Sequence, residues 1–259
     1  MSTFIHDSAI VSITAVLGAD CYIGAFSVVG DEVVLGDRVR LESHVVIEGK
    51  TSIGDDTKIF PFVSIGLAPQ DLKYAGEPTL TEIGKRNHIR EFVTIHRGTA
   101  GGGGLTMIGD DNLLMAQAHV AHDCQLGSNI IMANAATLAG HVEIADRANV
   151  GAYSGIHQFC RVGTEAFIGG YSVVVKDAPP YAVIQGNHAK CFGLNRVGMK
   201  RRGYSKETIE KLHHAYHLLL SAKLNTTQAV ERIKEEISGS IEVEMLVDFI
   251  ETSKRGVVK

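Results

Sequence analysis

The sequence predicts a mainly β fold: a left-handed parallel β-helix of hexapeptide repeats, followed by a C-terminal α-helical domain. Three observations support this prediction. An aliphatic residue recurs at every sixth position through most of residues 1–180, glycine is abundant while tryptophan is absent, and the pattern becomes that of amphipathic helices near Ser205. A period of six does not fit an α-helix, which repeats every 3.6 residues, but it fits short strands joined by corners.

The six-residue pattern is long, and it is interrupted twice. Its aliphatic members are Ile5, Val11, Leu17, Ile23, Val29, Leu35, Leu41, Ile47, Ile53, Ile59, Ile65, Ile83, Ile89, Ile95, Ile108, Leu114, Val120, Leu126, Met132, Leu138, Ile144, Val150, Ile156, Val162, Ile168 and Val174. We therefore expect two loop insertions, at residues 67–80 and 99–106, within an otherwise regular winding.

Side chains alternate along a strand, so each aliphatic residue and the residue two before it should point inward. Glycine often follows the aliphatic residue, where it lets the chain turn a corner without a Cβ penalty. Three hexapeptides then form one turn of about eighteen residues, and successive turns stack about 4.8 Å apart. Cys21, Cys124 and Cys160 occupy the position two before an aliphatic residue, which predicts packed core thiols.

Beyond Val174 the repeat stops, and residues 176–195 are expected to form an irregular connection. Helical periodicity follows over residues 205–222, 227–237 and 241–253, with Ser205 as a plausible N-cap and Gly239 as a break. We expect a β-helix over residues 1–180 and a connection with a helical domain over 181–259. The helices could cover one end of the β-helix, which would otherwise expose an unpaired edge.

Composition narrows the class of protein. The net charge of −4 gives no reason to expect nucleic-acid binding, and the longest apolar stretches are too short to span a bilayer. No secretion signal opens the sequence, and the four cysteines have no CxxC spacing. A cytoplasmic protein with reduced thiols and no membrane span is the expectation.

The winding predicts a cluster of histidines. Counting hexapeptides in threes, with the insertions treated as corner loops, puts the strands that end near Ile65, Ile95, Val120, Leu138 and Ile156 on one face. Five histidines then fall on that face or its trailing corner, where both loops also leave: His96, His119, His122, His141 and His157. Isolated surface histidines are commonly inert, but five in register beside two loops favour a functional site.

Two kinds of site remain open at this point. His96, His119 and His122 could supply three ligands to a metal, as in carbonic anhydrases built on hexapeptide β-helices. Against this, the histidines span three turns, about 14 Å, which suits an extended ligand better. The glycine run at residues 101–104 lacks the strand, lysine and Ser/Thr of a phosphate-binding loop and is interpreted as a flexible excursion.

Several longer motifs are specific to one family. They are PQDLKYAGEPT (69–79), IREFVTIHRGT (89–99), NLLMAQAHVAHDC (112–124), LAGHVEI (138–144), GIHQFCRVG (155–163) and GMKRRGYS (198–205). With these in order, the chain resembles over nearly its whole length the UDP-N-acetylglucosamine 3-O-acyltransferases that begin lipid A biosynthesis in Gram-negative bacteria.

The resemblance implies that the protein is an enzyme. It also implies a homotrimer with active sites between neighbouring β-helices. It implies transfer of a 3-hydroxyacyl chain from acyl carrier protein to the glucosamine 3-hydroxyl of UDP-N-acetylglucosamine. His122 matches the family's general base, Asp123 would orient its imidazole, and the Gly140 N–H matches the donor to the oxyanion. No metal or other cofactor is implied.

The resemblance also implies roles in substrate binding. The matched positions are Asp71, Lys73, His96, His119, His141, His157, Gln158, Asn195 and Arg201, and Gly170 matches the position that measures acyl-chain length. Val197 departs from the family, which commonly has an acid there, so the resemblance does not imply the nucleotide contact that this acid would make. A basic cluster, Arg196, Lys200, Arg201, Arg202 and Lys206, is either a solvated patch or a docking site for the acidic carrier protein.

Three alternative functions stay in view. A related N-acyltransferase shares the β-helix but has an additional N-terminal uridine-binding domain, for which a repeat beginning at Ile5 leaves no room. Metal-dependent hydration would require a metal, and a non-catalytic β-helix would have no reason to align five histidines. The preferred acyl length, and a 3-hydroxyl or 3-amino acceptor sugar, are not fixed by the sequence.

Overall fold

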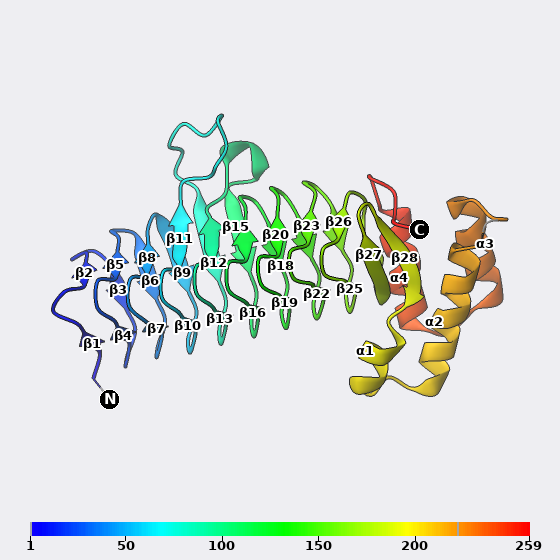
Figure 1. Ribbon diagram of the computed structural model, residues 1–259, viewed down its shortest axis with the longest axis horizontal. Coiled ribbons are helices and arrows are strands. Elements are labelled where there is room, and N and C mark those ends of the chain that lie inside the picture. The colour runs from blue at the N-terminus through cyan, green and yellow to red at the C-terminus, as the bar shows by residue number, and fades with distance from the viewer. Residues whose placement is uncertain (1, 222) are drawn as a thin grey trace.

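The computed structural model describes residues 2–221 and 223–259, and its architecture is the predicted left-handed parallel β-helix with a helical C-terminal part (Figure 1). Along the winding, strands pair in parallel with the strand one turn later, so that Phe4 lies opposite Tyr22. Equivalent corner residues, such as Ser8 and Phe26, are 18 positions apart. Since three strands make one turn, the winding forms three flat sheets.

Within the described residues, the three sheets, here called A, B and C, hold all the strands. Sheet A contains β1 (Phe4–Ile5), β4 (Tyr22–Ile23), β7 (Arg40–Leu41), β10 (Lys58–Ile59), β13 (His88–Ile89), β16 (Leu113–Leu114), β19 (Ile131–Met132), β22 (Asn149–Val150), β25 (Phe167–Ile168), β27 (Ala182–Gly186) and β28 (Ala189–Leu194). Sheet B contains β2 (Ile10–Val11), β5 (Val28–Val29), β8 (Val46–Ile47), β11 (Ser64–Leu67), β14 (Thr94–His96), β17 (His119–Val120), β20 (Thr137–Leu138), β23 (Gly155–Ile156) and β26 (Val173–Val174). Sheet C contains β3 (Val16–Leu17), β6 (Val33–Leu35), β9 (Lys50–Ile53), β12 (Leu80–Ile83), β15 (Leu105–Ile108), β18 (Gln125–Leu126), β21 (Glu143–Ile144) and β24 (Arg161–Val162).

The core is the interior of this prism. From Ile23 onward the aliphatic positions of the repeat are buried, and Cys21, Cys124 and Cys160 are at most 1% exposed, which confirms their prediction as core thiols. Corners recur three residues after the aliphatic position, where the backbone enters the left-handed region at residues such as Asp123 (φ 60°) and His141 (φ 61°). Non-glycine residues seldom adopt this conformation, and here the stacked turns hold it.

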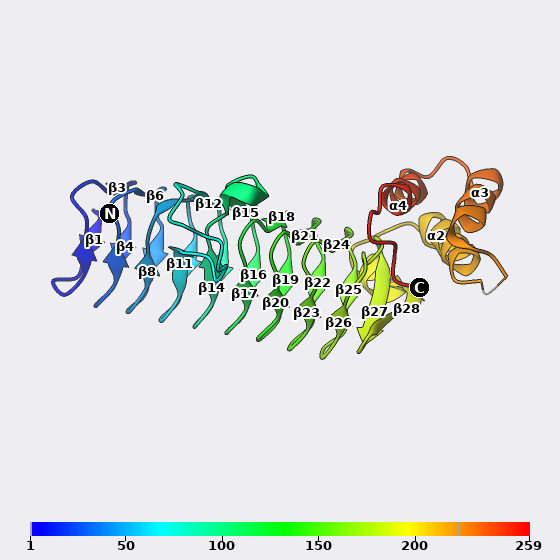
Figure 2. The same cartoon turned by 90° about the horizontal axis from the view of Figure 1, so that it is seen from above.

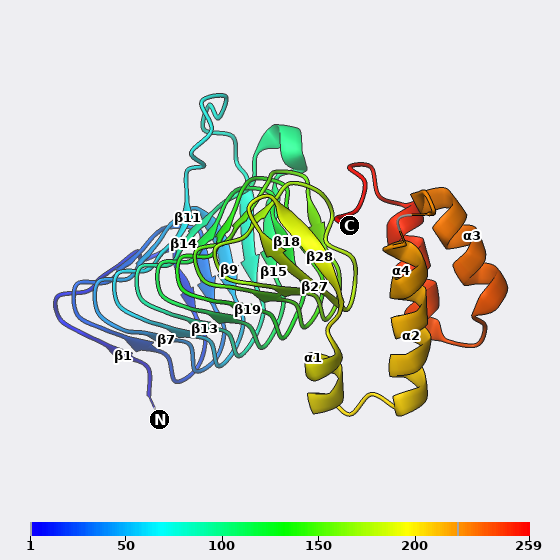
Figure 3. The ribbon, with the colours of Figure 1, turned by 45° about the vertical axis from the view of Figure 1, so that its right-hand side comes forward.

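Both insertions leave the winding between sheets B and C and protrude from the same edge of the prism (Figures 1 and 3). The first loop joins β11 to β12 and the second joins β14 to β15. Their predicted limits need correction, because Leu67 and Leu80 are strand residues and Leu105 already begins β15. Thr106 pairs with Thr81 and occupies the inward position two before Ile108, so it belongs to the repeat.

The connection predicted as irregular is instead ordered as β27 and β28. β27 adds to sheet A by pairing in parallel with β25, and β28 returns antiparallel to it. The helices are α1 (Arg196–Arg201), α2 (Lys206–Leu219), α3 (Thr226–Glu236) and α4 (Ile241–Glu251). Ser205 caps α2 as predicted, by accepting from the Thr208 N–H at 3.0 Å. Helix α1 was not predicted, and Ala222, in the predicted 205–222 helix, lies outside the described residues.

The helices cover the C-terminal end of the β-helix (Figure 2). The Tyr216 hydroxyl donates to the Pro180 carbonyl, and Arg161 of β24 donates to the Phe249 carbonyl of α4 at 2.8 Å. At the other end, the inward-facing Ile5 is still 43% exposed because no further turn covers it. In the described part of the chain, no helix is both long and apolar enough to cross a membrane.

Candidate active site

The structure confirms the predicted histidine face. Ile65, Ile95, Val120, Leu138 and Ile156 pair in sequence along sheet B, in β11, β14, β17, β20 and β23. The His96 and His119 rings meet edge to face with centroids 5.0 Å apart, and those of His122 and His141 do so at 5.1 Å. Four of the five histidines thus form two contacting pairs, one along the sheet and one at its trailing corner.

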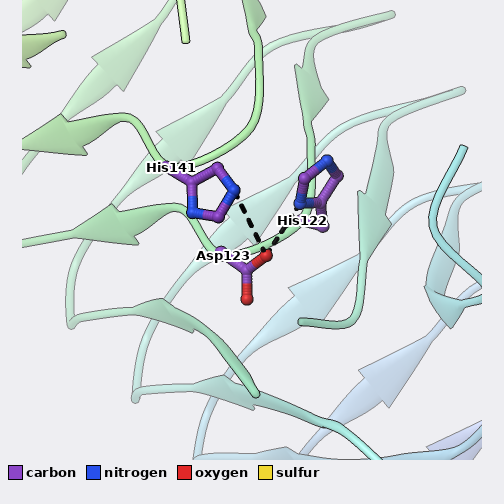
Figure 4. Close-up of side chains that lie close together, drawn as sticks. All are labelled: His122, Asp123 and His141. Carbon is purple, nitrogen blue, oxygen red and sulfur yellow. Dashed lines mark hydrogen bonds and ion pairs between the residues drawn. The ribbon is translucent and has the colours of Figure 1, made fainter. Parts of the chain in front are cut away.

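At this corner, His122 and Asp123 form a hydrogen-bonded pair (Figure 4). His122 Nδ1 lies 2.7 Å from Asp123 Oδ2. An ionised carboxylate only accepts hydrogen bonds, so a neutral His122 ring in this contact has its proton on Nδ1 and its lone pair on Nε2. Within residues 2–221 and 223–259, Nε2 has no partner. The His122 side chain is 17% exposed and that of Asp123 is fully buried, so the imidazole faces outward from a buried acid.

Three further groups hold Asp123. The Thr99 amide donates to Oδ1 at 2.8 Å and the Thr99 hydroxyl donates to Oδ2 at 2.6 Å. The backbone N–H of Asp123 donates to Thr106 Oγ1 at 2.8 Å. Thr99 belongs to the second loop and is the last residue of the IREFVTIHRGT motif, but the sequence analysis assigned it no role in the site. Only the fold brings a loop residue to a carboxylate 24 positions later.

Gly140 lies one turn beyond His122. A Cβ built there would stand 2.5 Å from His122 Cε1 and 2.7 Å from Nε2, so only glycine leaves room for the imidazole. The Gly140 N–H has no acceptor in the described part of the chain and is free to donate, while its carbonyl accepts from Phe159. The next residue, His141, stacks on the Phe159 ring at 4.4 Å.

Burial keeps three of the histidines neutral near pH 7. It lowers the pKa of His96 to about 4, with help from the neighbouring His119 and His122, and His96 is only 6% exposed. Burial likewise lowers the pKa of His119, whose Nδ1 lies 2.7 Å from Thr94 Oγ1. It also lowers the pKa of His141, against the opposing charges of Asp123 and Asp71. Neutral imidazoles can both donate and accept hydrogen bonds.

Other predicted binding residues extend this surface in two directions. Asp71, on the first loop, is near enough for its charge to act on His141, and it folds back to accept from the Lys73 N–H at 3.0 Å. His157 and Gln158 are exposed toward the helical end, where an Arg255 nitrogen lies 3.3 Å from His157 Nδ1. A groove of about 460 Å³ beside Asp123 and His141 runs past Phe159 to Arg255.

Three predicted residues do not meet the histidines within one chain. Asn195 caps α1 and donates to the Glu165 carbonyl, at the corner between sheets C and A, and Arg201 lies on the same helix. Gly170 follows β25, at the corner between sheets A and B. His122, by contrast, lies between sheets B and C. α1 protrudes from the opposite edge of the prism from the two loops (Figures 1 and 3).

The metal alternative can be tested on donor geometry. Among the described residues, the ligand atoms that gather within 4.8 Å belong to His122, Asp123 and His141, not to the three histidines considered from sequence. Both Asp123 oxygens already accept from Thr99, and Oδ2 also accepts from His122 Nδ1. A metal at this carboxylate would have to displace these donors, so the arrangement favours a hydrogen-bonded pair.

A left-handed β-helix of hexapeptide repeats with a helical C-terminal part is the fold of the hexapeptide-repeat acyltransferases. The family model described as Udp N-acetylglucosamine O-acyltransferase, Domain 2, matches residues 177–258, and the bacterial transferase hexapeptide model matches residues 14–49. The chain belongs to the UDP-N-acetylglucosamine acyltransferase family, as its similarity to solved members shows.

Solved members from distant organisms share nearly the whole fold. LpxA of Acinetobacter baumannii is 46% identical, with 98% of this chain and 99% of that chain covered and a TM-score of 0.96. The UDP-N-acetylglucosamine acyltransferase of Bacteroides fragilis is 40% identical, with 99% and 100% covered and a TM-score of 0.96. The Arabidopsis enzyme of the same name is 31% identical, with 99% and 100% covered and a TM-score of 0.87.

Proposed function

We propose that this protein transfers a 3-hydroxyacyl chain from acyl carrier protein to the glucosamine 3-hydroxyl of UDP-N-acetylglucosamine, the first step of lipid A biosynthesis. The observation that supports this most is the 2.7 Å bond between His122 Nδ1 and the buried Asp123, because Nε2 of the same ring has no partner among the described residues. Family membership supplies the substrate class, and the site supplies the chemistry.

In the proposed mechanism, His122 Nε2 removes the proton from the sugar hydroxyl as its oxygen attacks the thioester carbonyl. Asp123 holds the opposite side of the ring and stabilises the imidazolium that forms. The Gly140 N–H donates to the developing oxyanion. The tetrahedral intermediate then collapses with loss of the carrier's thiolate, which takes the proton from His122. All bonds and protons balance without a metal or other cofactor.

A homotrimer is part of the proposal, because one chain does not bring the predicted groups together. Asn195, Arg201 and Gly170 lie at prism corners away from His122, so a neighbouring β-helix would have to supply them. Co-expression of His122→Ala with Arg201→Ala tests this directly. Mixed trimers should regain part of the lost activity, since some interfaces then combine an intact His122 with an intact Arg201. Activity no higher than that of the separate variants would refute shared sites.

Docking of the carrier protein follows from charge. Arg196, Lys200 and Arg201 on α1 have no ion-pair partner among the described residues, whereas Arg202 pairs with Glu165 at 2.8 Å. Three cationic side chains without ion-pair partners on one short helix give a positively charged surface, which favours docking of the acidic carrier protein. Because salt screens this attraction, the KM of the protein for acyl carrier protein should rise with ionic strength.

The decisive experiment incubates the protein with UDP-N-acetylglucosamine and a panel of 3-hydroxyacyl carrier proteins, alongside His122→Ala. The parent should form the acylated sugar nucleotide, and the variant should lose at least about a thousandfold in kcat, as expected when a general base is removed. His88→Ala is the matched control, because that exposed histidine lies in sheet A, away from the site. Full activity in His122→Ala would refute the assignment of the base.

A further inference from the structure

The second loop holds the acid of the proposed catalytic pair. Thr99 is 8% exposed, and both its amide and its hydroxyl donate to Asp123, at 2.8 and 2.6 Å. The hydroxyl shares Oδ2 with His122 Nδ1, which is 2.7 Å from the same atom. A buried carboxylate with three donors has its orientation fixed, because any rotation would leave a charged oxygen without a partner.

A second imidazole competes for the same oxygen. His141 Nε2 lies 3.8 Å from Asp123 Oδ2, beyond hydrogen-bond range but close enough to be reached by a small rotation of the carboxylate. The Thr99 bonds resist that rotation. They therefore keep Oδ2 on His122, whose Nε2 has no partner among the described residues, rather than on His141, which stacks against Phe159.

Gly102 completes the support on the same loop. A Cβ built at Gly102 would stand 2.1 Å from Asp123 Cγ, so any side chain there would displace the carboxylate or lift the loop. A Cβ at the neighbouring Gly101 would meet nothing within 4 Å. The glycine run at residues 101–104, interpreted from sequence as a flexible excursion, thus contains one position, Gly102, where a side chain would collide with the Asp123 carboxylate.

We propose that Thr99 is a positioning residue that acts through Asp123 to hold His122 in its reactive orientation, and that Gly102 leaves the space in which it does so. The inference rests on the proposed function for its activity readout. It goes beyond that function by assigning the second loop a part in the reaction, although the loop need not touch either substrate.

Thr99→Val tests the proposal, because valine keeps the shape and the backbone N–H but removes the hydroxyl. We expect kcat to fall about tenfold to a hundredfold with KM changed less than about twofold, since one hydrogen bond to a buried charge is lost. Thr99→Ser keeps the hydroxyl, so its kcat should stay within about threefold of the parent's. Thr81→Val is the matched control: Thr81 is a buried threonine one turn away in sheet C, and its Oγ1 has no partner among the described residues.

Two additional readouts separate positioning from a general loss of structure. In an Asp123→Asn background, adding Thr99→Val should lower kcat by less than about threefold, because both changes disable the same contact. The downfield proton resonance of His122 Nδ1–H, identified by its loss in Asp123→Asn, should shift upfield or broaden in Thr99→Val and stay in place in Thr81→Val. Gly102→Ala should reproduce the kcat loss, while Gly101→Ala should match the parent.

The outcomes distinguish this inference from the proposed function. A parent without acyltransferase activity would refute the proposed function, and the resonance would still report on Thr99. An active parent with normal kcat in both Thr99→Val and Gly102→Ala would refute the inference alone. A loss that is fully additive with Asp123→Asn, or a resonance unmoved in Thr99→Val, would also overturn it. If the valine variant does not fold, Thr99→Ala against Thr99→Ser makes the same comparison.

Discussion

Gly140 offers a sharp test of how closely the proposed base must be placed. In Gly140→Ala the new methyl group would stand 2.5 Å from His122 Cε1 and 2.7 Å from Nε2. Non-bonded carbon atoms prefer about 3.5–4.0 Å, so the imidazole must retreat by about 1 Å. The backbone N–H of residue 140 is unchanged, so the substitution displaces the base without deleting the oxyanion donor.

A misplacement of about 1 Å can cost on the order of a hundredfold in rate. That corresponds to about 2.7 kcal/mol of activation free energy. We therefore expect kcat to fall roughly a hundredfold in Gly140→Ala, with KM for the sugar nucleotide much less affected. Steady-state assays at saturating acyl carrier protein measure both parameters, and thermal melting shows that the variant remains folded.

Gly155→Ala is the matched control for Gly140→Ala. Gly155 lies in β23 on the same sheet, and a Cβ built there meets nothing within 4 Å. It should retain nearly full kcat. A Gly140→Ala variant with more than half the parent's kcat, or a Gly155→Ala variant that loses as much as Gly140→Ala, would refute the steric reasoning.

The remaining predictions concern pH, acyl length and metal. Burial lowers the pKa of His96 from its ordinary value of 6.5 to about 4, so its contribution to stability is full above pH 6.5 and is lost as pH falls toward 4. Replacing it by Asn should therefore reduce the drop in unfolding free energy between pH 7 and 4.5 by about 2 kcal/mol, measured by denaturant titration, and an unaltered drop would contradict the burial argument. A Cβ at Gly170 meets only Ala152, at 3.2 Å or more, so Gly170→Met should fold and shift the kcat/KM optimum toward shorter acyl chains, and an unchanged preference would count against a measuring role. Overnight dialysis against EDTA should leave kcat unchanged, whereas loss of activity restored by zinc would revive a metal site at His122 and His141.

The sequence predicted the β-helix well because its rule is local. One aliphatic residue in six, with a small residue two before it, is enough to define an inward face, so the core positions of Val120 and Cys124 followed from spacing alone. The same counting predicted that distant strands would stack, since each loop is simply added at a corner. It predicted the ordered segment around β27 and β28 poorly, because those strands follow no repeat and form by adding to an existing sheet edge.

The sequence by itself therefore determined the winding, the face that carries the histidines and the corner from which both loops leave. Only the tertiary structure decided which imidazole bonds to Asp123, which loop residue supports that carboxylate and which glycine leaves room for the ring. Those choices depend on the directions of side chains and on differences of a few tenths of an ångström in the distances between atoms of neighbouring turns. Periodicity determines which residues share a face, but not which of their atoms touch.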